Sequence, residues 1–385
     1  METLGRFFQA PDQSLFLFGP RGTGKSTWAR SAFPDALILD LLEPVAYRRY
    51  AARPERLQEL VAGSPDRKQV LIDEVQRVPA LLPVVHALIE EKRGRQFILT
   101  GSSARKIRRE GVDLLAGRAL LRTLHPFMAT ELGEAFHLGD ALKLGLVPLV
   151  VAAAHPKETL RGYVTLYIEE EVRTEGLVRS IGDFSRFLEA ASLSHGTVLN
   201  VSCLARECEV DRKTVENYLS ILEDLLLAFR IPVFSRRAKR KLVSHPKLYI
   251  FDAGVYGSLR PRGPLDRSEE VAGAGLEGLV AQHLRAWNAY RGDRDRLFYW
   301  RTQSGVEVDF VVYGETGLHA IEVTSSRRVD PADLRKLRAF AEDYPDSHLV
   351  LLYLGPERLK KDGIHCLPCE EFLKALHPHR ILPGL

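Results

Sequence analysis

Short apolar runs alternate with stretches of helical periodicity through the first 130 residues of the chain. Because parallel strands need crossover connections, which are usually helices, this alternation predicts a parallel sheet wound with helices. Residues 1–130 are therefore expected to form an α/β domain. The predicted strands are residues 14–19, 37–40, 69–73, 96–100 and 119–124.

The pattern changes twice after residue 130. Residues 131–190 are mostly helical, and residues 196–232 show two short helical patterns and a longer one at 211–231, followed by a basic segment. Residues 260–274 are rich in Pro, Gly and charge, which is typical of a loop or linker. An α/β pattern then returns, with helices at 275–290 and 330–343 and strands at 296–301, 307–313, 318–324 and 348–353. The predicted domains are 1–130, 131–190, 191–245 and 246–385.

Composition narrows the class of protein. A chain of 385 residues with 45% hydrophobic and 27% charged residues is typical of a globular protein of two or three domains. The net charge of +4 permits nucleic acid as a partner without requiring it. We find no apolar run of about 18 residues and no apolar signal segment in METLGRFFQAPDQ, so we expect a cytoplasmic protein without a membrane span.

The four cysteines are too few for a disulfide scaffold and fit a reducing compartment. Cys366 and Cys369 form a CxxC, and Cys203 and Cys208 form a looser pair, so a four-thiolate zinc site is one interpretation. All four lie in apolar patterns, which favours ordinary core or surface cysteines.

The segment GPRGTGKS fits the phosphate-binding pattern GxxxxGK[ST] and lies between a predicted strand and a predicted helix. Glycines let backbone N–H groups surround a phosphate, and the helix N-terminus adds partial positive charge. Lys25 is expected to reach the β- and γ-phosphates of ATP, and the Ser26 hydroxyl to bind Mg²⁺. The predicted nucleotide-binding residues are Gly19, Pro20, Arg21, Gly22, Thr23, Gly24, Lys25, Ser26 and Thr27.

Two acids end the third predicted strand, in QVLIDEV. Asp73 is expected to hold the magnesium of MgATP, and Glu74 to polarise the attacking water. The next strand ends in hydroxyls, and Ser102 or Ser103 is expected either to hydrogen-bond the γ-phosphate or the attacking water, or to cap a helix.

Arg118 precedes the fifth predicted strand. A guanidinium there is placed to reach the γ-phosphate of a neighbouring subunit and to stabilise transition-state charge, which would make turnover depend on assembly. An ordinary surface arginine is the alternative.

The segments LFLFGPRGTGKST, LIDEVQRVP, FILTGSS and LLAGR resemble the AAA-type ATP-binding proteins of bacteria and archaea that carry a C-terminal domain of unknown function. The resemblance continues through KLYIFDAGVYGSL, GLEGLVAQHL, YWRTQSGVEVDFVV and HAIEVTSS. It implies an AAA-type ATPase core with a helical lid over 131–190, a winged-helix-like segment over 191–245, and an α/β C-terminal domain over 246–385 resembling PD-(D/E)XK nucleases.

Such nuclease folds use three carboxylates to bind magnesium and a lysine to assist the attacking water. The resemblance places the acids at Glu277, Asp309 and Glu322, and it places Thr324 where the lysine is expected. Arg301 or Arg327 is the candidate replacement, so a degenerate or nucleic-acid-binding module is favoured over an active nuclease. Glu307 shares the strand face of Asp309, and ordinary solvated strand ends remain the other reading.

Residues 197–227 suggest a helix-turn-helix whose second helix presents polar residues near its N-terminus, as in DNA recognition. A packing unit and a solvated hairpin are the alternatives for this helix pair and for the basic run that follows it. The candidate nucleic-acid-binding residues are Arg212, Lys213, Thr214 and Asn217 in the helix, and Arg236, Arg237, Lys239, Arg240 and Lys241 in the run, where they would neutralise phosphates.

The sequence thus predicts an oligomeric ATPase, with a hexamer as one candidate state, that couples MgATP hydrolysis to a C-terminal module associated with DNA or another partner. An ATP-dependent nuclease and a nucleotide-gated switch for a protein partner are the alternatives.

Overall fold

The computed structural model describes residues 4–103, 115–167, 172, 178, 180–236, 240–261, 263–264 and 266–383. The chain divides into two compact units. The nucleotide unit comprises Phe8–His125 with Glu223–Leu227, and the second unit comprises Met1–Phe7, Pro126–Leu222 and Ala228–Leu385.

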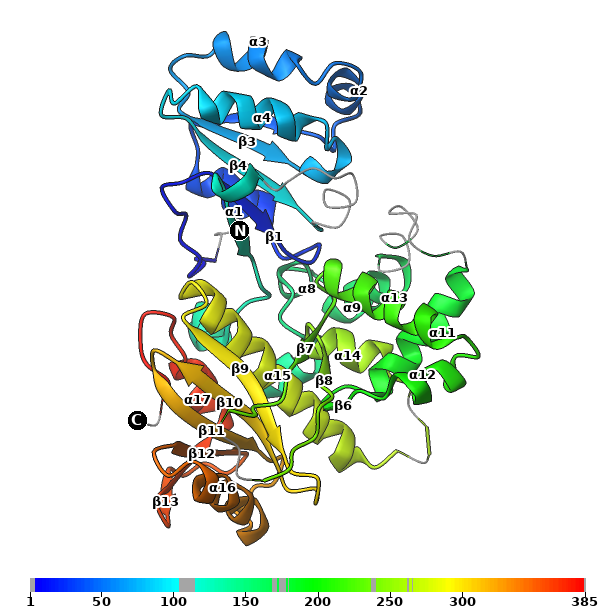
Figure 1. Cartoon of the computed structure of the whole chain (residues 1–385), viewed down its shortest axis with the longest axis vertical. Coiled ribbons are helices and arrows are strands. Elements are labelled where there is room, and N and C mark those ends of the chain that lie inside the picture. Colours follow the sequence, from blue (N-terminus) through cyan, green and yellow to red (C-terminus); the bar gives the residue numbers. More distant parts are fainter. Residues whose placement is uncertain are drawn as a thin grey trace. The chain divides into compact units, whose positions relative to one another are not determined.

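A five-stranded sheet, in which every neighbouring pair is parallel, forms the centre of the nucleotide unit. Its strand order is β2-β3-β4-β1-β5, and Figure 1 labels β1, β3 and β4. The strands are β1 (Leu15–Phe18), β2 (Leu37–Asp40), β3 (Gln69–Asp73), β4 (Gln96–Gly101) and β5 (Leu120–Thr123). The helices are α1 (Lys25–Ala32), α2 (Pro44–Ala52), α3 (Arg56–Ala62), η1 (Val75–Arg77), α4 (Leu81–Glu90) and η2 (Leu115–Gly117).

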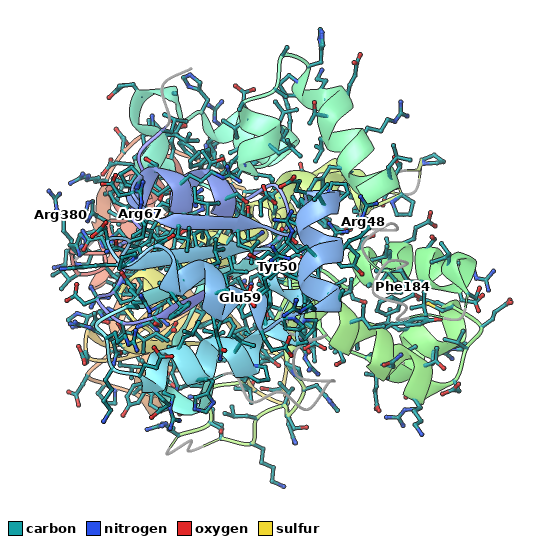
Figure 2. All side chains as sticks on the ribbon, turned by 90° about the horizontal axis from the view of Figure 1, so that it is seen from above. Arg48, Tyr50, Glu59, Arg67, Phe184 and Arg380 are labelled. Carbon is teal, nitrogen blue, oxygen red and sulfur yellow. The ribbon has the colours of Figure 1, made fainter. Side chains whose placement is uncertain are left out.

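The parallel sheet confirms the α/β architecture predicted for this unit. The apolar runs form its strands, as expected for a parallel sheet that is covered on both faces. All four residues of β1 are buried, whereas the edge strands β2 and β5 are partly exposed. Helix α2 contributes the buried Tyr50 to the core, next to the exposed Arg48 (Figure 2).

The second unit begins with short helices: α6 (Ala129–Leu132), η3 (Gly133–Ala135), α7 (Leu138–Leu144), α8 (Pro148–Val151), α9 (Pro156–Gly162) and η4 (Tyr163–Tyr167). A group of three helices follows, α11 (Ile181–Leu193), α12 (Val201–Glu207) and α13 (Arg212–Asp224). Phe184 (Figure 2) packs against Phe187 and Tyr218 and joins α11 to α13.

A three-stranded antiparallel sheet, in the order β6-β8-β7, accompanies these helices. Its strands are β6 (Thr197–Val198), β7 (Ala228–Ile231) and β8 (Lys247–Ile250). The helix predicted over 211–231 is longer than the helix in the structure. Helix α13 ends at Asp224, Leu226 adopts a positive φ of 60°, and the last predicted turns pair with β8 instead.

The C-terminal part contains a six-stranded sheet in the order β13-β14-β12-β11-β10-β9. Its strands are β9 (Asp295–Arg301), β10 (Glu307–Gly314), β11 (Gly317–Val323), β12 (His348–Tyr353), β13 (Leu359–Lys361) and β14 (Ile364–Pro368), and the nearby helices are α14 (Ala253–Leu259), α15 (Ser268–Tyr290), α16 (Pro331–Asp343) and α17 (Cys369–Ala375). Helix α15 begins inside the predicted linker 260–274, with Glu269 and Glu270 in its first turn.

Two apolar cores flank this sheet. Phe310 and Ile321 pack in the same core as Leu279 of α15, whereas Val311 packs with Leu337 of α16 in the other. Strands β9, β10 and β11 are antiparallel, and β11, β12 and β14 are parallel. The sheet thus lies between α15 and α16.

Residues 232–236 and 240–246, which belong to the connection between β7 and β8, follow the edge strand β9. Phe234 N–H donates to the Tyr299 carbonyl (2.7 Å), and Val243 N–H donates to the Arg301 carbonyl (3.1 Å). The Phe234 ring is buried among aromatic residues that include Tyr313 and Phe340. This connection joins the three-stranded sheet to the six-stranded sheet within one compact unit, and the division into four domains stays a prediction.

The described helices include none with the length and apolar character that crossing a membrane requires. Cys208, Cys366 and Cys369 are buried and Cys203 is partly exposed, all as free thiols.

Candidate functional site

The loop between β1 and α1 has a backbone that depends on glycine. Gly22 and Gly24 adopt positive φ values of 79° and 84°, a region that other residues rarely enter. A Cβ on Gly19 would approach the Leu124 carbonyl oxygen to 2.5 Å. Helix α1 begins at Lys25, so its first N–H groups adjoin the loop. The predicted residues from Gly19 to Thr27 therefore lie at a strand-to-helix turn suited to a phosphate.

Lys25 is 5% exposed, and its ammonium group folds back over the loop. Nζ donates to the carbonyl oxygens of Gly19 (2.8 Å) and Pro20 (3.1 Å). Thr23 supports the same turn by donating its hydroxyl to the Pro20 carbonyl (2.7 Å). A positive charge is thus held among backbone dipoles at the point where the pattern predicts polyphosphate.

Ser26 and Asp73 meet beside this loop. The Ser26 hydroxyl donates to Asp73 Oδ1 at 3.0 Å, and the Thr100 hydroxyl donates to the same oxygen. Asp73 is 1% exposed. Sequence reasoning predicted Ser26 and Asp73 at one magnesium site. It did not include Thr100, although that residue ends the run FILT on the neighbouring strand.

Glu74 follows Asp73 in an unusual backbone conformation, with φ 59° and ψ 46°. Its carboxylate accepts a hydrogen bond from Gln76 Nε2 at 2.5 Å, and the same amide donates to the Ser102 hydroxyl at 3.1 Å. Gln76 and Ser102 are 5% and 3% exposed. Sequence reasoning missed Gln76, because a single polar residue in a short turn does not indicate which side chain it contacts.

The strand order explains why these residues meet. Strand β4 lies between β1, which leads into the glycine loop, and β3, which ends in the two acids. Because all three strands are parallel, their carboxyl ends share one edge of the sheet. Ser102 and the fully buried Ser103 follow β4 at that edge.

Arg118 lies between η2 and β5 and pairs with Glu90 at the end of α4. The Arg118 guanidinium holds the pKa of Glu90 below its usual range, first by a hydrogen bond and then by its charge. The Arg118 side chain is 38% exposed, so it remains accessible to another molecule.

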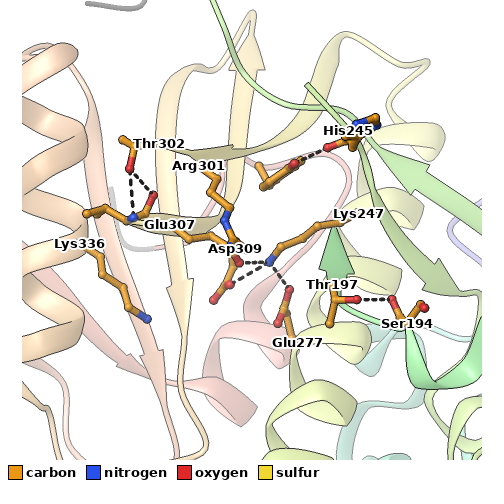
Figure 3. A network of polar contacts seen from close by, with 12 residues as sticks. Ser194, Thr197, His245, Lys247, Glu277, Arg301, Thr302, Glu307, Asp309 and Lys336 are labelled. Carbon is orange, nitrogen blue, oxygen red and sulfur yellow. Dashed lines mark hydrogen bonds and ion pairs between the residues drawn. The ribbon is translucent and has the colours of Figure 1, made fainter. Parts of the chain in front are cut away.

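A second polar cluster lies in the C-terminal part, around the ammonium group of Lys247 (Figure 3). Nζ is 2.9 Å from Glu277 Oε1, 2.5 Å from Glu307 Oε1 and 3.3 Å from Asp309 Oδ1. Tyr249 donates its hydroxyl to Glu277 Oε1 at 2.6 Å. Two of the three predicted acids, Glu277 and Asp309, thus lie near each other. Lys247, which sequence reasoning missed, lies between them.

Electrostatics in this cluster follow from burial. Burial raises the pKa of Glu277 to about 7, and the nearby Asp309 charge adds to the shift. Burial also opposes the charge on Lys247, but the neighbouring Tyr249, Glu277 and Asp309 raise its pKa well above the ordinary value.

Glu322 has different partners. Lys336 of α16 pairs with its Oε1, and the Asp309 N–H donates to its Oε2 at 3.3 Å. Thr324, at the expected lysine position, donates its N–H to the Leu352 carbonyl. The replacement cations considered from sequence were Arg301 and Arg327. Arg301 pairs with Glu307 (2.9 Å), but the cations next to the predicted acids are Lys247 and Lys336.

No group of three or more His, Cys, Asp or Glu residues is placed to hold a metal ion in the part of the chain that the structure describes. Among these described residues, neither Cys203 with Cys208 nor Cys366 with Cys369 belongs to such a group.

The candidate nucleic-acid residues have unlike surroundings. Arg212, Lys213 and Asn217 are exposed on α13, whose start is capped by Asp211 accepting from the Thr214 N–H (2.9 Å) and hydroxyl (2.7 Å). In the basic run, Arg236 stacks on Tyr313, Arg240 pairs with Glu342 and Asp343, and Lys241 is exposed, whereas Arg237 and Lys239 lie outside the described residues.

Comparison with family models divides the chain into three parts. The model described as "AAA domain" matches residues 11–133. Models for two domains of unknown function, DUF8612 and DUF4143, match residues 136–266 and 272–372. Residues 11–133 are therefore an α/β P-loop core of the AAA-like ATPase class.

Relatives and solved structures add context. The chain is similar to the uncharacterized protein Rv2008c of Mycobacterium tuberculosis, with 28% identity over 369 residues, 93% of this chain and 80% of the relative. An uncharacterized protein of Haemophilus influenzae is 25% identical over 217 residues, 52% of this chain and 54% of the relative.

AMPPCP-bound DnaA from Aquifex aeolicus matches 55% of this chain and 82% of its own, with 14% identity and a TM-score of 0.26. The signal-transduction ATPase PH0952 from Pyrococcus horikoshii matches 73% and 46%, with 14% identity and a TM-score of 0.23. TM-scores of this size do not establish a shared overall fold.

Proposed function

We propose that the chain is an ATPase that binds MgATP at the loop from Gly19 to Ser26 and hydrolyses it. One observation carries the proposal: Lys25, Ser26, Asp73 and Glu74, residue types suited to phosphoryl transfer at a P-loop, converge at one sheet edge. The match of residues 11–133 to an AAA domain supports the same class.

Each residue has a distinct role in this proposal. Backbone N–H groups from Gly22 to Lys25 bind the β-phosphate, and Lys25 leaves the loop carbonyls to pair with the β- and γ-phosphates. Glu74 accepts a hydrogen bond from the attacking water and orients it. Ser102 and Ser103 fix the far side of that water or the γ-phosphate.

The residues present fit a magnesium ion that arrives with ATP. The Ser26 hydroxyl and Asp73 Oδ1 are hard oxygen ligands 3.0 Å apart, and Mg²⁺ is bound in such sites by few protein oxygens together with phosphates. When bound, the ion neutralises charge on the β- and γ-phosphates. Thr100 holds Asp73 in position through its hydroxyl.

Assembly is the second part of the proposal. Arg118 is placed to serve the γ-phosphate of a neighbouring subunit in a homo-oligomer, for which a hexamer is a candidate state. In the conformation described, Glu90 holds this guanidinium, so its catalytic use requires that the ion pair open.

Coupling to DNA is the third part. The order α11-β6-α12-α13-β7-β8, with sheet order β6-β8-β7, supports a winged-helix-like segment, and the exposed Arg212 and Lys213 support contact with phosphates. A DNA-independent switch for a protein partner is the alternative, and salt-dependent DNA binding separates the two. The helical segment over 131–190 remains proposed as the lid.

The C-terminal part is proposed to be nuclease-like in fold. The order α15-β9-β10-β11-α16-β12, with Glu277, Asp309 and Glu322 on α15, β10 and β11, supports this interpretation. The absence of a cation at Thr324 favours binding over cleavage.

The decisive experiment compares binding and turnover of ATP in two variants. K25A is expected to lose retention of labelled ATP, whereas E74Q is expected to retain ATP and lose turnover. A wild-type protein that retains no nucleotide with magnesium, or a K25A protein that retains it equally well, would overturn the proposal.

A further inference from the structure

Lys247 is held in its position by the fold. It opens β8, the central strand of the three-stranded sheet, and its side chain is 1% exposed. The residues before it follow β9, and the Tyr299 hydroxyl donates to the His245 carbonyl. The backbone of Lys247 is therefore anchored on both sides, and its ammonium group is enclosed by protein.

Three carboxylates from two elements surround this ammonium group. Glu277 comes from α15, and Glu307 and Asp309 come from β10 (Figure 3). Their oxygens lie 2.5 to 3.3 Å from Nζ. A magnesium or manganese ion bound by the same oxygens would lie about 2.1 Å from each, in space that the ammonium group fills.

The remaining oxygens of the predicted metal ligands also have protein partners. Asp309 Oδ2 accepts from the Val323 N–H at 2.9 Å. Glu322 accepts from the Asp309 N–H with one oxygen and pairs with Lys336 through the other. A divalent ion at these acids would have to displace several protein donors, so the residues present do not fit the metal that the nuclease resemblance implies.

We propose that the Lys247 ammonium group is the permanent cation of this carboxylate cluster. In consequence the wild-type protein binds no divalent metal there and cleaves no phosphodiester bond with it. The cluster instead fastens β8, and with it the preceding helical segment, to α15 and β10. This inference is independent of the nucleotide site, so its failure would leave the ATPase proposal intact.

The test measures manganese binding to the whole chain without nucleotide. The EPR signal of free Mn²⁺ reports how many ions remain unbound. Wild type and D309N are expected to bind the same number of ions. K247M removes the charge and keeps the length of the side chain, so it is expected to bind one more ion per chain than wild type. K247M/D309N is expected to lose that ion, and K247R, which keeps a cation, is the matched control.

Two results would overturn the inference: a wild-type site that D309N removes, or a folded K247M protein that gains no ion. If K247M does not fold, the comparison of wild type with D309N decides alone. Supercoiled DNA incubated with wild type and Mn²⁺ provides the functional readout, and nicking that D309N abolishes would also contradict the inference.

Discussion

The side chain of Gln76 links Glu74 to Ser102. Its amide nitrogen lies 2.5 Å from Glu74 Oε2 and 3.1 Å from Ser102 Oγ. Glu74 has a positive φ, which an ordinary residue adopts at a cost of about 1–2 kcal/mol. Gln76 therefore stabilises a carboxylate position that the backbone alone does not favour, and it connects the ends of β3 and β4.

We expect Q76L to lower kcat for ATP by about 10- to 100-fold, because a hydrogen bond to a charged group contributes about 1.5–3 kcal/mol and about 1.4 kcal/mol is tenfold in rate. KM should change little, since Gln76 is not part of the phosphate loop. Steady-state ATPase assays measure both constants. Q58L, at an exposed position of α3, is the matched control, and a folded Q76L protein with the wild-type kcat would exclude this positioning role.

R118A is expected to lower turnover by about 10³-fold and to leave ATP affinity unchanged, because an arginine supplied to the γ-phosphate acts in the transition state. E90Q removes the ion pair but keeps Arg118, so its turnover should equal or exceed that of wild type. Rates measured over a dilution series report the dependence on assembly. Equal losses in R118A and E90Q would instead indicate that the pair only supports the structure.

DNA binding should distinguish two groups of basic residues. R212A/K213A is expected to weaken binding and to reduce the slope of log K against log salt by about 2, because each residue neutralises one phosphate. R240A should have little effect on this slope, since Arg240 already pairs with Glu342 and Asp343. Fluorescence anisotropy at several salt concentrations provides the measurement, and a larger slope change in R240A would reverse the assignment.

Two histidines are buried as neutral acceptors, and each should lower stability in acid, whereas the raised pKa values of Glu277 and Asp252 act in the opposite direction. Burial lowers the pKa of His195 to about 3 and that of His283 to about 4. His195 Nδ1 accepts from the Ile250 N–H, and His283 Nε2 accepts from the Ala129 N–H. Below about pH 6.5 the unfolded chain takes up protons that the folded chain does not.

The contribution of each histidine to the free energy of unfolding should therefore decrease between about pH 6.5 and 4, by up to about 1.4 kcal/mol per pH unit. Urea unfolding at several pH values measures this slope. H283Q should change this slope by up to the equivalent of one bound proton. H155Q, at an exposed position, should leave the slope unchanged. An unchanged slope in H283Q would show that His283 is protonated in the folded state.

Local patterns predicted most of the regular structure. The strand expected at 307–313 is Glu307–Gly314, and the helix expected at 330–343 is Pro331–Asp343. Strand β7 was mistaken for the end of a helix, because its apolar residues continue the helical periodicity of α13 and only pairing with β8 makes them a strand.

The glycine loop and the acids of β3 were predictable because a short motif specifies them. Lys247 and Lys336 were not, since their contacts with Glu277 and Glu322 depend on how separate helices and strands pack. Gln76 left one signal in the sequence, a polar residue two positions after Glu74, but the hydrogen bond depends on the positive φ at Glu74.

The route of residues 232–236 and 240–246 along β9 affects how the C-terminal part can be studied. A fragment that starts at residue 246 would keep Lys247 but would lose β6 and β7, the strands on both sides of β8. It would also lose Phe234 from an aromatic core that contains Tyr313 and Phe340. Enzymatic inactivity of such a fragment would reflect a damaged protein, so recombinant work on the carboxylates needs a chain that begins before α11.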